Sequence, residues 1–392
     1  MKYILIVGDG MADYPIDELG GKTPLQAANI PNMDKLAREG IIGTAETIPD
    51  GMLPGSDVAN LAVMGYDPQK YYTGRAPLEA ASMGISLEPD ETAFRCNLVT
   101  VENGLMMDYS GGHISTPEAR GLIEAVDASL GNERVKFYPG VSYRHLMVLK
   151  DNILPTCTPP HDISGKDIEP FLPQGSGAEI LRELMSASCR VLEAHEINHQ
   201  RIQEEKKPAN MIWLWGYGKP IKMPTIQQRF NLSGGVISAV DLVRGIGKCA
   251  GLRSIDVPGI TGYYDTNYIG KAEYALDVLK NDDFVFIHIE APDEASHNGD
   301  LAAKIKAIED IDAKVLSTIL SHIPDNTRIL LLPDHETPLS TRTHASGPVP
   351  FVMWGAGIKP DDSLSYDENS ARNSRLRFEN GWEILEYFIG QS

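Results

Sequence analysis

The chain has 392 residues, a length that favours two domains, and 42% of its residues are hydrophobic, enough for two cores. Its formal net charge is -19, from 35 basic and 54 acidic residues, and no basic tract offsets it, which argues against a nucleic-acid partner. The four cysteines are far apart and form no Cys-x-x-Cys pair, which is typical of reduced thiols in a cytoplasmic protein. No apolar stretch approaches the length of a membrane span, so we expect no membrane partner.

The first predicted strand, residues 3–7, leads directly to Asp9, which lies between two glycines. Glycines at this point let the backbone turn sharply and bring the carboxylate close to a ligand. A Gly-Asp-Gly turn by itself is more often structural than functional. A helix at residues 31–39 and a short strand at 43–47 follow.

Ser56 stands between a Pro-Gly turn and a helix predicted to begin near Asp57. A serine at this position is most often an N-cap that satisfies backbone N–H groups. The same placement would expose its hydroxyl beside the positive end of the helix dipole, which suits a phosphoryl acceptor. Both interpretations stay open at this point.

Residues 86–224 contain β-like runs separated by glycine and proline turns, together with helices, and predict an inserted α+β domain. The core would then consist of residues 1–85 and 225–392. Three polar clusters lie in glycine-rich turns of the insertion: SGGH ending at His113, Tyr143-Arg144-His145, and HDISGK starting at His161 and Asp162. Each by itself indicates a solvated loop, and together they are candidates for substrate contacts.

Alternation of helices and strands resumes after residue 234, and two later strands are followed by aspartate and histidine residues of the kind that bind metals. The apolar strand 284–289 is followed by Asp293 and His297, four residues apart, which share one face of a helix. The apolar run 329–332 leads straight to Asp334 and His335, and His344 returns from the next loop. Buried apolar strands alternating with helices predict an α/β core with a mostly parallel sheet flanked by helices. Ligands bind at the carboxyl ends of the strands in such sheets.

The strand-end groups together suit two divalent cations beside a reactive hydroxyl. They are Asp9, Ser56, Asp293, His297, Asp334, His335 and His344. A mixture of carboxylates and imidazoles favours ions of the manganese or zinc kind over pure magnesium or calcium sites. A serine between two such ions would be a nucleophile. The competing interpretation is that each carboxylate caps a helix and each histidine is a satisfied polar residue. His288, inside an apolar strand, is interpreted as a buried hydrogen-bonded histidine.

These segments resemble the alkaline phosphatase superfamily and, more narrowly, the cofactor-independent phosphoglycerate mutases of the shorter, archaeal type. The similarity covers nearly the whole chain and is carried by five further segments: GSDVANLAVMGYDP, YYTGRAPLEAAS, FYPGVSYRHLMV, HDISGK and APDEASH. It implies an alkaline-phosphatase-like core with an inserted substrate domain. It also implies a glycolytic isomerase that interconverts 2- and 3-phosphoglycerate through a phosphoserine at Ser56.

The resemblance assigns the site residue by residue. One cation would bind Asp9, Ser56, Asp334 and His335, and the other would bind Asp293, His297 and His344. Manganese is the first expectation, with zinc, cobalt and magnesium as alternatives. His113 would assist substrate binding, and Arg75 and Arg144 are chosen because a guanidinium forks onto carboxylate or phosphate. The longer bacterial mutases carry an arginine set that has no match in this chain.

Several functions would use the same metal core. The main expectation is a small phosphorylated hydroxy acid as substrate, and the alternatives are a homoserine kinase-like phosphotransferase and a metal-dependent phosphatase. A non-catalytic metal-binding protein is a further alternative, which the intact Ser56 disfavours. No oligomeric state is predicted.

Overall fold

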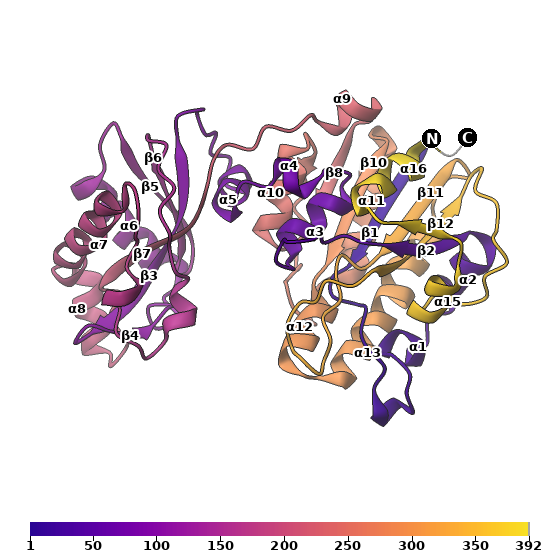
Figure 1. The fold of residues 1–392 in the computed structure, drawn as a ribbon, viewed down its shortest axis with the longest axis horizontal. Helices are drawn as coiled ribbons and strands as arrows, with labels where there is room; N and C mark the ends of the chain where they lie inside the picture. Colours follow the sequence, from indigo (N-terminus) through magenta and orange to yellow (C-terminus); the bar gives the residue numbers. More distant parts are fainter. Residues whose placement is uncertain (391–392) are drawn as a thin grey trace. The chain divides into compact units, whose positions relative to one another are not determined.

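The computed structural model describes residues 1–390 and divides into two compact units, which are considered separately. The first unit is Met1–Tyr72 together with the described part of Lys222–Ser392, and the second is Thr73–Ile221. The second unit is thus inserted into the first, as the ribbon colours in Figure 1 show.

The first unit is built on an eight-stranded, mostly parallel sheet. Its strands, in spatial order, are β13 (Leu376–Phe378), β2 (Ile41–Ala45), β12 (Val349–Gly355), β11 (Thr327–Leu332), β1 (Lys2–Gly8), β10 (Phe284–Ile289), β8 (Gly234–Ile237) and β9 (Arg253–Ser254). Only β12 runs antiparallel to its neighbours. At the centre, Leu5 of β1 pairs in register with Leu330 of β11 and Phe286 of β10. The carboxyl ends of these three strands therefore meet at one edge.

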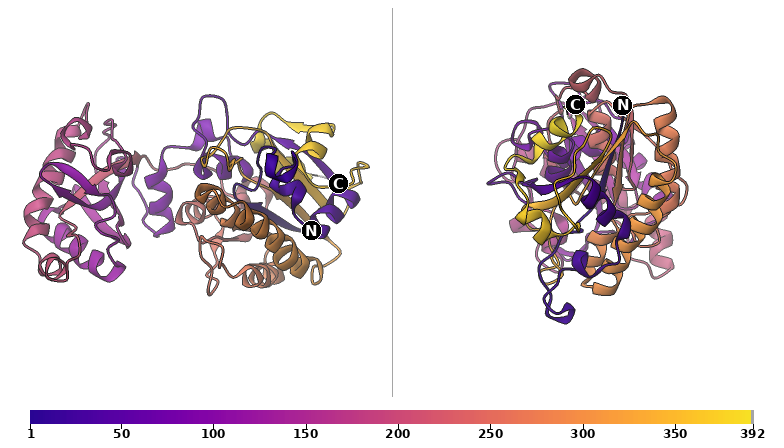
Figure 2. Two further views of the ribbon diagram at one scale, coloured as in Figure 1. Left: turned by 90° about the horizontal axis from the view of Figure 1, so that it is seen from below. Right: turned by 90° about the vertical axis from the view of Figure 1, so that its right-hand side faces the viewer.

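Helices cover both faces of this sheet, as Figures 1 and 2 show. On the face that carries Ile4 and Ile6, α2 (Pro31–Glu39), α11 (Tyr268–Asn281) and α13 (Leu301–Asp310) complete one apolar core. The opposite face carries Tyr3 and Val236, which contact α16 (Ile384–Gly390) and α10 (Asp241–Cys249) respectively. α10 also packs against α3 (Ser56–Val63). Such two-sided burial is why the central strands are apolar throughout.

The second unit contains a five-stranded antiparallel sheet. Its strands are β4 (Leu105–Asp108), β3 (Thr92–Glu102), β6 (Arg144–Leu149) and β5 (Val135–Val141), with β7 (Met211–Gly218) on the other side of β3. One face packs Phe94, Cys96 and Leu98 against α6 (Thr116–Leu130) and α7 (Ala178–Glu193). The period-two alternation leaves Arg95 and Asn97 on the other face.

The remaining elements are short. They are α1 (Pro24–Ala27), α4 (Pro68–Tyr71), α5 (Arg75–Ser82), α8 (Glu196–Gln203), α9 (Ile226–Phe230), α12 (Ala291–Asn298), α14 (Ser317–Leu320) and α15 (Glu368–Asn373). 3-10 turns lie at Asp17–Leu19, Pro160–Ile163, Glu169–Phe171 and Gly381–Glu383. A π-helical segment, Ile311–Leu316, joins α13 to α14, and its Asp312 accepts the Met33 N–H at 2.7 Å. This bond ties the segment to the start of α2.

The fold class predicted from the sequence, an α/β core with an inserted α+β unit, is confirmed. The boundaries of the inserted unit differ from the prediction, however. The second unit is Thr73–Ile221, whereas the sequence predicted residues 86–224. The first difference has a packing cause, because α5 places Ala76 and Ala80 against Ala93 of β3 and Leu146 of β6. Among the described residues, no helix combines the length and the apolar character needed to cross a lipid bilayer.

Candidate active site

Three carboxylates converge at the carboxyl edge of the first unit's sheet. Asp9 follows β1, Asp293 lies in the first turn of α12 just after β10, and Asp334 follows β11. All three are at least nine-tenths buried. Gly10 makes this convergence sterically feasible, since it has φ +60° and a Cβ there would lie 2.6 Å from Asp293 Oδ1.

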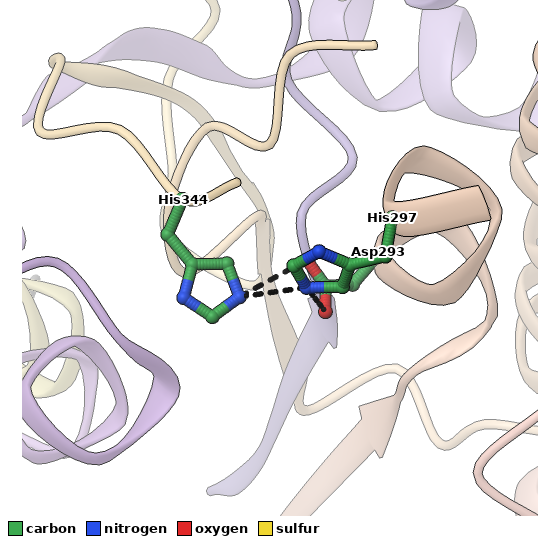
Figure 3. Close-up of side chains that lie close together, drawn as sticks. All are labelled: Asp293, His297 and His344. Atoms are coloured by element: carbon green, nitrogen blue, oxygen red, sulfur yellow. Dashed lines mark hydrogen bonds and ion pairs between the residues drawn. The ribbon is translucent and has the colours of Figure 1, made fainter. Parts of the chain in front are cut away.

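The first cluster consists of Asp293, His297 and His344 (Figure 3). His297 Nε2 lies 3.0 Å from Asp293 Oδ2 and 3.0 Å from His344 Nε2, which is itself 3.5 Å from Asp293 Oδ1. On its other side, His297 Nδ1 lies 2.9 Å from the Arg342 carbonyl oxygen and donates to it. This bond leaves Nε2 facing the cluster, the usual arrangement of a metal-ligating histidine.

Charge explains the protonation of this first cluster. The hydrogen bond that His297 donates to Asp293 raises the pKa of His297 to about 9, although burial opposes the shift. Burial raises the pKa of Asp293, but hydrogen bonds from His297 and His344 outweigh it and hold that pKa well below its ordinary value. A cation bound between these side chains would therefore displace a proton from His297 below about pH 9.

The second cluster gathers Asp9, Asp334 and His335. His335 Nε2 lies 3.5 Å from Asp9 Oδ1 and 3.6 Å from Asp334 Oδ2. Asp9 Oδ1 is buried without a hydrogen-bond partner among residues 1–390. Burial and the nearby carboxylates of Asp334 and Asp293 raise the pKa of Asp9 well above its ordinary value. A bound cation would remove this repulsion, so the donor set fits a divalent ion.

Ser56 joins the second cluster through His335. Its Oγ lies 3.3 Å from His335 Nε2, and the side chain is only half-buried. Gly55 is the N-cap of α3, so Ser56 is the first residue of the helix and its hydroxyl makes no capping bond. The structure thus disfavours the N-cap interpretation and leaves the hydroxyl beside the carboxylates and the helix N-terminus.

Three polar residues support these clusters but were not predicted from the sequence to belong to the site. Asn60 Nδ2 donates to Asp334 Oδ2 at 2.7 Å and to the Ser56 carbonyl at 2.9 Å. Thr337 Oγ1 donates to Asp293 Oδ1 at 2.6 Å and lies 3.1 Å from His335 Nδ1. Asn60 follows Ser56 by one helical turn and Thr337 follows His335 by two residues, so spacing from the predicted ligands was the available signal.

His288 is the third missed residue. It is fully buried, and its Nε2 lies 3.3 Å from Asp9 Oδ2 and 4.0 Å from Asp334 Oδ2. Burial alone lowers its pKa, but the facing carboxylates outweigh burial and raise that pKa well above its ordinary value. The expectation of a buried histidine is therefore met, yet this histidine faces the acidic cluster.

The second unit contains a group of cationic side chains, which we call the arginine face: Arg75, Arg95 and Arg144. Arg95 was not predicted, because it interrupts an otherwise apolar strand. Its guanidinium lies over the Trp215 ring at 4.2 Å, and its Nε is 3.0 Å from Glu79 Oε1. Burial lowers the pKa of Arg95, and the charges of Arg75 and Arg144 add to this effect while Glu79 opposes it.

The other predicted substrate contacts lie differently in this unit. The His161 ring packs 5.4 Å from the Trp215 ring, and its pKa is lowered by burial and by the charges of Arg95 and Arg75, although Asp162 raises it. His161 Nε2 lies 3.6 Å from Asp162 Oδ1, and both side chains are exposed. His113 is an exposed residue with φ 49° in the turn after β4, and no hydrogen bond or ion pair within residues 1–390 joins its side chain to the arginine face.

Comparisons with known proteins identify relatives of the whole chain. A family profile described as 2,3-bisphosphoglycerate-independent phosphoglycerate mutase matches residues 37–198. The chain is 55% identical to such a mutase from Methanosarcina barkeri, over 96% of each protein. It is 53% identical to a probable mutase of the same kind from Geobacter sulfurreducens, over 99% of this chain and 100% of the relative.

Two solved structures are similar over nearly their whole length. A Pyrococcus horikoshii protein shares 32% identity with a TM-score of 0.86, covering 100% of this chain and 98% of its own. A cofactor-independent phosphoglycerate mutase from Thermoplasma acidophilum shares 28% identity with a TM-score of 0.71, covering 99% of both chains.

Proposed function

The chain belongs to the 2,3-bisphosphoglycerate-independent phosphoglycerate mutase family, and from this premise we propose that it interconverts 2- and 3-phosphoglycerate through a phosphoserine at Ser56. The observation that carries the proposal is the half-buried Ser56 hydroxyl, 3.3 Å from His335 Nε2 beside Asp9 and Asp334. A hydroxyl that only capped its helix would have no need of this acidic surrounding.

Ser56 is the nucleophile of the first transfer. A bond forms between its Oγ and phosphorus while the bond from phosphorus to the glycerate oxygen breaks. The serine loses one proton and the departing glycerate oxygen gains one, so the step is balanced. The second transfer reverses these bonds onto the other hydroxyl of the same glycerate. Asn60 supports both steps, because its amide holds the first turn of α3 to the Asp334 carboxylate.

The two carboxylate–imidazole clusters are the proposed metal ligands. Asp293, His297 and His344 would hold one divalent ion, and Asp9, Asp334 and His335 with Ser56 would hold the other. The mixture of oxygen and nitrogen donors suits manganese, with zinc and cobalt as alternatives and magnesium less well matched. When bound, such ions lower the pKa of a nearby hydroxyl and stabilise charge on a transferring phosphoryl group.

The inserted unit is the proposed source of substrate recognition. Arg75, Arg95 and Arg144 supply guanidinium groups that match carboxylate and phosphate in shape and charge. Within this group, Arg95 is already ordered by Glu79 and the Trp215 ring, so little side-chain entropy is lost on binding. His113, His161 and Asp162 complete the proposed contacts.

A three-part assay tests the function. Purified enzyme with Mn²⁺ is given 3-phosphoglycerate, and formation of 2-phosphoglycerate and release of inorganic phosphate are followed together. In parallel, homoserine phosphorylation is measured with ATP. We expect rapid isomerisation with negligible phosphate release and no phosphohomoserine. Net phosphate release or homoserine phosphorylation faster than isomerisation would replace the proposal with a phosphatase or a kinase.

A further inference from the structure

A buried chain of side chains reaches the second cluster from within the first unit. Glu290 follows β10 and accepts hydrogen bonds at Oε1 from Ser238 Oγ at 2.9 Å and the Ala239 N–H at 3.1 Å. Its Oε2 accepts from Lys271 Nζ at 3.0 Å, and Lys271 also donates to the His288 carbonyl at 2.7 Å. Lys271, Glu290 and His288 are all fully or almost fully buried. So many donors fix the Glu290 carboxylate in one position.

Glu290 in turn orients His288. The two residues lie two apart, and His288 Nδ1 is 3.2 Å from Glu290 Oε1. A ring nitrogen this close to an ionised carboxylate carries the proton and donates it. Histidines that bind metals usually donate their second ring N–H to a carboxylate in this way, which fixes the tautomer and turns the other nitrogen toward the ion.

The other nitrogen of His288 points into the acidic cluster without a hydrogen bond. Within residues 1–390, His288 Nε2 is buried and has no hydrogen-bond partner, although Asp9 Oδ2 lies 3.3 Å away and Asp334 Oδ2 lies 4.0 Å away. One ion bonded at about 2.1 Å to a nitrogen and to oxygens holds these ligand atoms roughly 3 to 4 Å from one another. The spacing of these three atoms is therefore that of ligands around a shared ion.

We propose that His288 is a metal ligand, which completes a cation position with Asp9 and Asp334 and is presented by the Lys271–Glu290 pair. This position lies on the Asp9 Oδ2 side, whereas His335 approaches Asp9 Oδ1. Asp9 would thus bridge the new position and the one beside Ser56. The inference rests on the proposed function only in treating Asp9 and Asp334 as metal ligands.

The competing arrangement is that His288 is a permanent imidazolium paired with Asp9. The metal-ligand and imidazolium arrangements predict opposite effects on Mn²⁺ affinity when the His288 ring is removed. Metal-free enzyme and the variant His288→Asn are titrated with Mn²⁺, and binding is followed by calorimetry without substrate. Loss of a ligand weakens Mn²⁺ binding by at least about 10- to 100-fold, the range seen even for supporting residues. Loss of an imidazolium instead removes a repelling charge and tightens binding. Tighter or unchanged binding would overturn the proposal.

His145→Asn is the matched control, since His145 is also buried with an unpartnered Nε2 but has Arg120 and Arg144 as its neighbouring charges. We expect its Mn²⁺ affinity to be unchanged. If His288→Asn does not fold, anomalous diffraction from wild-type crystals grown with Mn²⁺ decides the question. A peak within bonding distance of His288 Nε2 supports the proposal, and its absence while the Ser56 position is filled overturns it. Phosphorylation of Ser56 is measured separately, so either idea can fail alone.

Discussion

The two units of this protein concentrate opposite charges. At the carboxyl edge of the eight-stranded sheet, three buried carboxylates converge and imidazoles lie among them. In the five-stranded unit, Arg95 pairs with Glu79 and is close enough to Arg75 and Arg144 for their charges to lower its pKa. A chain with a net charge of -19 therefore contains one site suited to cations and another suited to anions. Local arrangement, and not net charge, decides what each site binds.

The largest expected effect is on Ser56, the proposed nucleophile beside the acidic clusters. Ser56→Ala removes the hydroxyl proposed to accept the phosphoryl group, so kcat for isomerisation should fall at least about 1,000-fold. Ser321→Ala, which removes an exposed hydroxyl bonded to the Ser317 carbonyl, is the control and should leave kcat unchanged. Ser56→Ala enzyme with more than a tenth of wild-type activity would show that another group accepts the phosphoryl.

The arginine face should govern affinity. Arg95→Met keeps the length of the side chain but removes its charge, and we expect KM for phosphoglycerate to rise about 10- to 100-fold with a smaller change in kcat. Arg134→Met in the same unit is the control, since its ion pair with Asp151 is exposed and should contribute little. An unchanged KM for Arg95→Met would remove the face from the proposed binding site.

The pH dependence of metal binding tests the acidic site of the first unit. Because the pKa of His297 is raised to about 9, a cation at this cluster displaces a proton below that pH. Mn²⁺ affinity should therefore rise about 10-fold per pH unit up to about pH 9 and then level off. His297→Gln should flatten this slope for the site, whereas a slope that persists in the variant would assign the proton elsewhere.

The raised pKa of His297 should also make the stability of the metal-free protein depend on pH. A raised histidine pKa stabilises the fold below the unfolded-state value near 6.5, and this contribution is lost as the pH rises through about 9. The Tm measured in EDTA should accordingly fall over that interval. In His297→Gln the fall should be smaller.

The smallest expected effect concerns where the units divide. An excised segment 73–221 retains α5, whereas 86–221 exposes the surface that Ala76 and Ala80 bury. The shorter segment should lose about 3 kcal/mol or more of its free energy of unfolding, by apolar burial alone. Urea unfolding of both segments measures this difference. Equal stability would favour the boundary predicted from the sequence.

The sequence predicted the acidic site better than the arginine face, for a physical reason. Asp9, Asp293 and Asp334 each follow a buried strand, and parallel strands bring such positions to one edge. Arg95 instead depends on Glu79 and Trp215, which sheet pairing and helix packing bring to it from distant positions. The same holds for α5, which was assigned to the first unit because the alanines that dock it onto β3 carry no signal of their partner.

His288 shows an intermediate case. Its place in an apolar strand correctly predicted burial, and Glu290 two residues later lies on the same side, which was a readable signal. Lys271 comes from a separate helix, so the support that fixes Glu290 was not visible in the sequence. Pattern reasoning thus found most of the proposed ligands but not the residues that orient them.

The central claim is that Ser56 carries the phosphoryl group between the two transfers. Enzyme loaded with Mn²⁺ is mixed with 3-phosphoglycerate, quenched within one turnover, digested and mapped by mass spectrometry. The account predicts one phosphate, on the peptide that contains Ser56, which disappears when the quench is delayed until substrate has been removed. Full isomerisation with no phosphate on Ser56, or with phosphate on another residue, would contradict it.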